Sequence, residues 1–304
     1  MKPASIIFLV ISILFCVGGY ACMRIGQSKA ASEGIDILAG TASKDEDYLY
    51  RYEYDEDSIG KISINVKEAT VNIIGGSSKA YIELVNFPEG MYEFSSSNRI
   101  LTVSNNSDFS QITDMASLVF NFKGLRSLVN YYNIHDRPKT INVYVTDELP
   151  VNVFDCKIEK GDVTIKDNSS RSDYNVTIGN GNLTLQKITT DSAAVLELEN
   201  GKLIIDDCAI ADLKITHKKG DSELITTAVR KLSAEIGEGD FNFGCRDDLS
   251  YYNLNLFTGV GSVKIDGADK GGFYEETSLP TDSKYEINVT KGGITLNSNM
   301  TSEY

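Results

Sequence analysis

Three aspartates that each follow a glycine in a repeated turn are the residues of this chain best suited to chemistry. They are Asp162, Asp221 and Asp240. If successive turns stack as neighbouring strands do, Asp221 and Asp240 lie about 5 Å apart, near the carboxylate separation of a retaining glycosidase. Carboxylate oxygens in loops also suit calcium.

The same turn position in other copies argues against both activities, because it does not require a carboxylate. It holds Asn182, Lys202 and Ser262 elsewhere, as expected for a turn that accepts any small or polar residue. The calcium repeat Gly-Gly-x-Gly-x-Asp, nucleophilic triads, phosphate-binding loops and dinucleotide fingerprints are missing, and there is no Trp to stack on a sugar. We therefore expect no enzyme activity, no cofactor and no metal site.

The histidines also favour structure over catalysis. His217 occupies an inward position in the repeat, and Ser222 interrupts the apolar pattern of the same unit. A lone histidine at such a core defect is more often hydrogen-bonded than catalytic. His135 is the only other histidine, and two isolated histidines without a shared motif do not form a metal site.

The three cysteines of the body are expected to be free. Cys156 occupies an inward position of the repeat, where a buried cysteine behaves as a small hydrophobic residue. Cys208 and Cys245 fall at nearly the same position two units apart, which is near 10 Å by strand spacing and too far for a disulfide.

One repeated segment positions all of these residues: a short strand, a turn with glycine, and a second short strand. The turn glycines are Gly161, Gly181, Gly201, Gly220, Gly239, Gly261 and Gly292. They are 20, 20, 19, 19, 22 and 31 residues apart. An eighth copy, EATVNI, has Ala69 in place of the glycine. The glycines mark corners that need a positive φ.

Apolar residues recur at fixed offsets from these glycines, with polar residues between them. The position five before the glycine holds Cys156, Val176, Leu196, Ile215, Ala234, Leu256 and Ile287. This alternation buries one face of each strand, and a unit of about 20 residues can bury that face only against neighbouring units. We predict an all-β parallel β-solenoid, with an antiparallel β-sandwich as the alternative.

The N-terminal part reads as an anchor and a linker. Residues 4–23 carry no charge and follow Lys2. This uncharged segment is long enough to form a transmembrane helix. We expect a signal anchor at 1–24, an acidic linker at 25–58 and the repeat domain at 59–304, outside the cell membrane. A cleaved signal ending at Ala21, or a lipoprotein beginning at Cys22, would also place the domain outside.

An insertion at about 104–140 breaks the repeat. Apolar residues at helical spacing predict an amphipathic helix over about 110–132. The insertion either caps the open end of the solenoid or contacts a partner or the membrane surface. Under the second interpretation the candidate contact residues are Met115, Val119, Phe122 and Leu125.

The net charge of -14 and the lack of a basic stripe argue against nucleic acid as a partner. The sequences SIGKISINVKEATVNI and INVYVTDELPVNVFDCKIEKGDVTI, followed by the Gly-Asp/Asn turn units, resemble a bacterial family of β-strand-repeat cell-envelope proteins regarded as adhesins, whose function is not established. The resemblance covers about 58–297. It implies an envelope protein, often anchored by an N-terminal helix, with no catalytic residues to transfer.

Two functional hypotheses follow. The first is a non-enzymatic, adhesin-like surface module, anchored by its N-terminal helix, that binds an envelope protein, a surface protein or a glycan. The second is an envelope-stress sensor or regulator that acts through a membrane partner.

Overall fold

The computed structural model describes residues 24, 28, 47–54, 59–87, 92–105, 133–146, 151–169, 171–277 and 279–301. The predicted membrane segment lies outside these residues, and so does the predicted helix with Met115, Val119, Phe122 and Leu125. Within the described part, no helix is both long enough and apolar enough to cross a membrane. Both features stay predictions.

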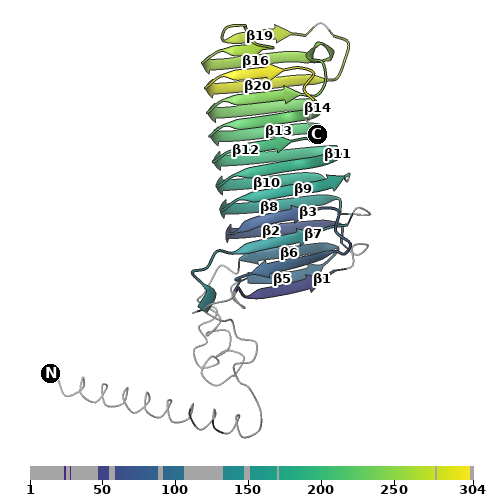
Figure 1. Cartoon of the computed structure of the whole chain (residues 1–304), viewed down its shortest axis with the longest axis vertical. Helices are drawn as coiled ribbons and strands as arrows, with labels where there is room; N and C mark the ends of the chain where they lie inside the picture. Colours follow the sequence, from purple (N-terminus) through teal and green to yellow (C-terminus); the bar gives the residue numbers. More distant parts are fainter. Residues whose placement is uncertain are drawn as a thin grey trace, which may run out of the picture.

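The described chain is mainly β-strand, wound into stacked coils (Figure 1). The strands in chain order are β1 (Leu49–Glu53), β2 (Lys61–Glu68), β3 (Thr70–Ile74), β4 (Tyr81–Val85), β5 (Tyr92–Ser97), β6 (Ile100–Asn105), β7 (Thr140–Tyr144), β8 (Val153–Lys160), β9 (Val163–Ser169), β10 (Asp173–Asn180), β11 (Leu183–Asn200), β12 (Leu203–Asp206), β13 (Ala209–Lys219), β14 (Ser222–Glu238), β15 (Phe241–Cys245), β16 (Asn253–Val260), β17 (Val263–Ile265), β18 (Ala268–Asp269), β19 (Phe273–Glu276), β20 (Lys284–Lys291) and β21 (Ile294–Asn297). A short 3-10 helix, η3 (Leu249–Tyr251), precedes β16.

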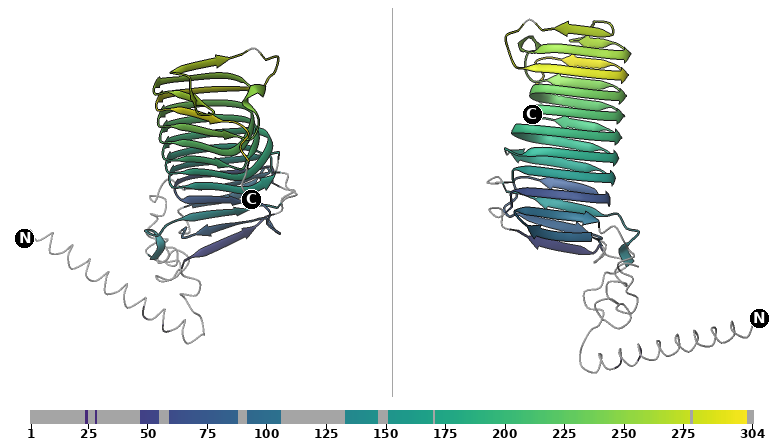
Figure 2. Two further views of the ribbon diagram at one scale, coloured as in Figure 1. Left: turned by 45° about the horizontal axis from the view of Figure 1, so that its top comes forward. Right: turned by 180° about the vertical axis from the view of Figure 1, so that it is seen from behind.

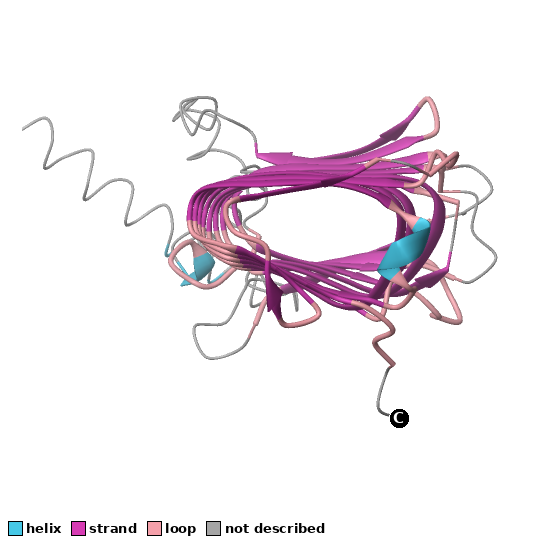
Figure 3. Ribbon diagram, turned by 90° about the horizontal axis from the view of Figure 1, so that it is seen from above, coloured by secondary structure: helices cyan, strands magenta, loops and turns pink. Residues whose placement is uncertain are grey.

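Two layers of strands face each other across the interior when the stack is viewed from its end (Figure 3). We call them the first and second sheets. The first runs β5, β6, β2, β8, β10, then the C-terminal parts of β11, β13 and β14, then β20, β16 and β19. The second runs β1, β4, β7, β3, β9, the start of β11, β12, the start of β14, β15, β21, β17 and β18. β11 and β14 bend around a corner and belong to both.

The coils stack in the register that the repeat predicts. Val176 pairs with Cys156 on one side and with Leu196 on the other, both in parallel strands. All three side chains are buried in one continuous apolar core. The antiparallel β-sandwich alternative is wrong, because the pairing from coil to coil is parallel.

The order of coils in space differs from their order in the sequence. β20 lies between β14 and β16 in the first sheet, so the last coil of the chain is enclosed by two earlier ones. At the other end, β2 lies between β8 and β6 in the same way. Both terminal coils of the described domain are therefore paired on two sides.

Antiparallel strands close both ends of the stack, which are seen from two further directions in Figure 2. At one end β5 pairs with β6, and β1 pairs with β4. At the other end β19 pairs with β16, and β18 pairs with β17. Whether the insertion at about 104–140 caps the stack or contacts a partner stays a prediction, because most of it falls outside the described residues. Residues 106–132 lie outside the description.

Candidate functional site

The acidic residues of the repeated turn form a ladder that bonds one coil to the next. The Oδ1 atom of Asp221 accepts a hydrogen bond from the backbone N–H of Asp240 at 2.9 Å. The Oδ1 atom of Asp240 accepts one from the backbone N–H of Gly293 at 2.7 Å. In the same way, the Oδ1 atom of Asp162 accepts from the backbone N–H of Asn182 at 2.7 Å. The Oδ1 atom of Asn182 accepts from the backbone N–H of Lys202 at 2.9 Å. The ladder therefore fixes the turn, and an asparagine serves as well as an aspartate.

Asp221 and Asp240 do lie on adjacent coils, as the sequence predicted. The described residues hold no group of three or more His, Cys, Asp or Glu side chains arranged to bind a metal. Each of the two carboxylates has an oxygen that already accepts from a backbone N–H. The arrangement supports the interpretation of this column as turn chemistry.

His217 and Ser222 form a hydrogen-bonded pair inside the core, at the defect that the sequence indicated. The Nδ1 atom of His217 lies 2.9 Å from the hydroxyl of Ser222, and its Nε2 atom lies 3.1 Å from the carbonyl oxygen of Gly201. A carbonyl only accepts, so Nε2 donates to Gly201 and the Ser222 hydroxyl donates to Nδ1. Desolvation by burial lowers the pKa of His217, so the neutral ring is favoured.

The three body cysteines are free and buried. Cys208 and Cys245 stand in one inward column with Thr227 between them, because Ala209 pairs with Ala228 and Thr227 pairs with Cys245. Burial raises the pKa of Cys208 to about 12, and that of Cys156 also to about 12. Such thiols are poor nucleophiles, so they add packing and no chemistry.

A second corner, present in four of the coils, was not anticipated from the sequence. Residues six after the turn glycine adopt a left-handed backbone, with φ between 46° and 53°: Asp167, Lys187, Asp207 and Thr226. Their residue types share no signal beyond two aspartates, which tolerate this conformation. The seven turn glycines, in contrast, have φ between 131° and 151°, a region that L side chains rarely adopt.

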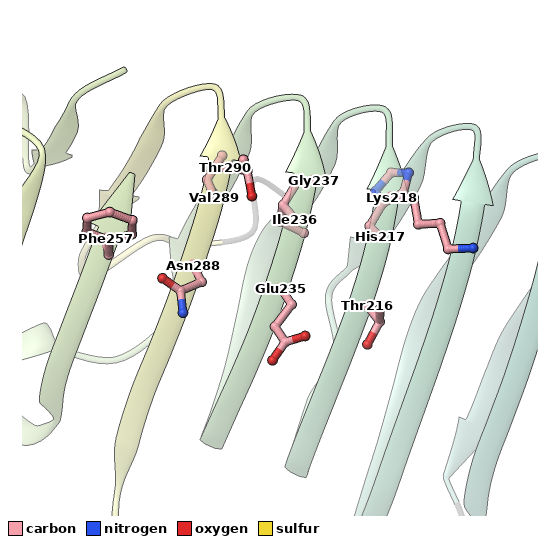
Figure 4. A pocket seen from close by; sticks show the side chains of 10 residues that line it. All are labelled: Thr216, His217, Lys218, Glu235, Ile236, Gly237, Phe257, Asn288, Val289 and Thr290. Atoms are coloured by element: carbon pink, nitrogen blue, oxygen red, sulfur yellow. The ribbon is translucent and has the colours of Figure 1, made fainter. Parts of the chain in front are cut away.

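A shallow hollow of about 410 Å³ lies on the outer face of the first sheet, over β13, β14, β20 and β16 (Figure 4). Its wall is a row of outward side chains in direct register across these strands: Thr216, Glu235, Asn288 and Phe257. Gly237, which has no side chain, lies in the lining between Lys218 and Thr290. The hollow combines polar groups with one aromatic ring and is open to solvent.

Exposed aromatic residues gather at the end of the stack next to this hollow. Phe257 on β16 is directly opposite Phe273 on β19. Their exposed fractions are 47% and 54%. The sequence contained a signal for Phe257, because it is an apolar residue at an offset where the other coils carry outward, mostly polar side chains.

Comparison with known proteins matches residues 59–302 to the model of the Toastrack DUF4097 family. Among solved structures, a protein from Bacteroides fragilis described as a candidate adhesin is 13% identical to this chain, with a TM-score of 0.39. The alignment covers 83% of this chain and 97% of that protein's chain. A protein from Clostridium sporogenes described as a candidate cell adhesion protein is 11% identical, with a TM-score of 0.33. The alignment covers 83% of this chain and 100% of that protein's chain. No curated protein matches the sequence.

The family match covers the repeat domain and agrees with the resemblance seen in the sequence. It begins two residues before β2 and includes every turn glycine. The chain belongs to the Toastrack DUF4097 family.

Proposed function

We propose that this chain is a non-enzymatic interaction module, displayed outside the cell membrane on an N-terminal anchor, that contacts its partner with the end of the stack formed by β16 and β19. The observation that carries the proposal is the exposed pair of Phe257 and Phe273 at that end. Contiguous exposed apolar surface of this kind often marks a site of interaction with another protein.

The β16 and β19 end is proposed to point away from the membrane, and the end at which the chain enters the stack supports this orientation. The described domain begins with β1, which lies at the end of the stack opposite β16 and β19 (Figures 1 and 2). An anchor in residues 4–23 would therefore hold the β1 end near the membrane and direct the aromatic end away from it. A stiff stack of hydrogen-bonded coils suits such a spacer.

The interior supports a non-enzymatic role. The candidate carboxylates Asp221 and Asp240 hold backbone N–H groups of neighbouring coils. His217 is enclosed in the core with both ring nitrogens engaged. Recognition on the outer surface is then the function that the fold serves best.

One experiment tests both the display of the domain outside the cell and the contact surface at the β16 and β19 end. A peroxidase fused to the C-terminus of the full chain would label neighbouring proteins on intact cells, and added protease would remove the same tag. We expect Phe257→Ser with Phe273→Ser to change the labelled set without changing protease access. Ile225→Ser, a partly exposed apolar residue on the second sheet, is the matched control. A tag protected from protease refutes display, and an unchanged labelled set refutes the contact surface.

A further inference from the structure

The outermost strand of the first sheet, β19, has a free edge. Among the described residues it pairs with β16 alone. The backbone N–H of Thr258 donates to the carbonyl of Gly272 at 2.9 Å, which fixes the phase of this antiparallel pair. Hydrogen-bonding direction alternates along a strand, so Tyr274 bonds toward β16, whereas the N–H and C=O groups of Phe273 and Glu275 point to the open side.

The side chains at this edge define what could be added to it. Phe273 continues the apolar patch begun by Phe257, and Glu275 stands opposite Asn255 on the same outer face. Glu275 forms no ion pair with another described residue. The lysines of β20, which lies on the far side of β16 from this edge, are already paired, Lys284 with Glu286 at 2.9 Å and Lys291 with Glu238 at 3.7 Å.

The other end of the stack also has outer strands that pair on one side only and also exposes Leu49 and Tyr50, but it differs in the packing of its aromatic rings. There β1 and β5 are the outer strands, and their rings pack on each other, with the centroids of Tyr52 and Phe94 4.5 Å apart. The β19 edge has no such closure within the described chain. A second copy is a poor occupant, because each chain carries a net charge of -14 and an approach of two β19 edges would bring the carboxylates of Glu275 and Glu276 together.

We propose that the free edge of β19 binds an extended segment of a basic partner protein by adding it as a further strand. The backbone of the segment hydrogen-bonds with Phe273 and Glu275. On the outer face, one of its apolar side chains packs on Phe273 and Phe257, and a Lys or Arg two residues away pairs with Glu275. This inference rests on the proposed function, since it specifies the partner chemistry of the same end of the stack.

The probe is the fluorescein-labelled peptide Thr-Val-Thr-Lys-Thr-Val-Thr-Lys, which places Val and Lys alternately on one face of a strand. Its comparison peptide has Glu in place of Lys. Binding to the full chain in a non-ionic detergent is measured by fluorescence anisotropy at low ionic strength. We expect the Lys peptide to bind more tightly, and a version methylated on alternate backbone nitrogens to lose binding, because strand addition needs those N–H groups.

Charge reversal gives the sharpest readout. Glu275→Lys reverses the preference from the Lys peptide to the Glu peptide, with a change of about two- to fivefold in each affinity, and Phe273→Ser weakens both peptides. Glu197→Lys, an outward residue of the same sheet far from the edge, keeps the wild-type preference. Retained circular dichroism and Tm show that each variant is folded.

The proposal is overturned if the wild-type chain binds both peptides equally, or if Glu275→Lys leaves the preference unchanged. It is also overturned if light scattering shows a dimer that Glu275→Lys disrupts, which would assign the edge to a second copy. None of these results affects protease access to the tag on intact cells, so failure of this inference is distinguishable from failure of display.

Discussion

Gly292 packs directly against Gly239, although Gly261 lies between them in the sequence. A Cβ added to Gly292 would lie 2.0 Å from the carbonyl oxygen of Gly239, and one added to Gly261 would lie 2.1 Å from that of Gly292. The column of corner glycines therefore runs Gly239, Gly292, Gly261. The last coil of the chain is inserted between two coils that precede it in the sequence.

Removal of the inserted coil should affect two coils. Without residues 284–304, β16 loses its parallel neighbour β20, and the C-terminal part of β14 becomes an edge. We expect hydrogen exchange followed by mass spectrometry to show loss of protection in both β16 and β14. As a control, a short linker in place of residues 268–276 removes only β18 and β19 and should leave β14 protected. Full protection of β16 in the truncated chain would mean that its coil restacks directly on the coil of Gly239.

The corner glycines cannot be replaced by alanine without strain. Gly201 has φ of 142°, and an added Cβ would lie 1.8 Å from the carbonyl oxygen of Gly181. We expect Gly201→Ala to reduce the free energy of unfolding by about 2–4 kcal/mol in urea denaturation. Ala69→Gly, at the corresponding corner of another coil, should cost no more than about 1 kcal/mol. Equal effects of the two substitutions would refute the steric explanation.

The turn ladder should respond to hydrogen-bonding capacity and not to charge. Asp240→Ala removes the acceptor of the Gly293 N–H group, so we expect a loss of about 1 kcal/mol in the free energy of unfolding. Asp240→Asn keeps that acceptor and should be close to wild type. Ser262→Ala, in the outermost coil, is the neutral control.

Calcium should leave Tm unchanged in the wild-type chain, because the carboxylates of Asp221 and Asp240 serve as backbone acceptors without a third ligand among the described residues. A rise in Tm with calcium that Asp240→Asn abolishes would reassign this column to metal binding.

Stability should fall as the pH falls below about 6.5, because of His217. Burial lowers its pKa in the folded state from the usual 6.5, so the unfolded chain takes up a proton at a higher pH than the folded chain does. The free energy of unfolding should decrease between pH 7.5 and 5.5, by at most about 1.4 kcal/mol from this group.

Urea denaturation of wild type and His217→Gln at the two pH values isolates the effect, since only the wild type contains this buried imidazole. His135→Gln is the matched control, because His135 is partly exposed and pairs with Asp136. A pH dependence that survives His217→Gln would assign the effect to other groups.

The local structure of each coil followed from the sequence. Period-2 alternation placed Val176 and its equivalents inside, and the corner glycines were identified because their backbone conformation excludes other residues. The pairing of His217 with Ser222 was also foreseeable, since two polar residues in one apolar pattern must satisfy each other. These features depend only on the residues of one coil and of the adjacent coil, which carries the same repeat pattern.

Only the tertiary structure decided which coil lies beside which. Every coil presents the same register of backbone groups and the same inward apolar column, so the coil of Gly239 could pair equally well with that of Gly261 or of Gly292. The choice depends on the path of the connecting segments and on the antiparallel strands at the ends. That choice puts β19 at the edge of the stack, where Phe273 and Glu275 lie on a strand that pairs with β16 alone among the described residues.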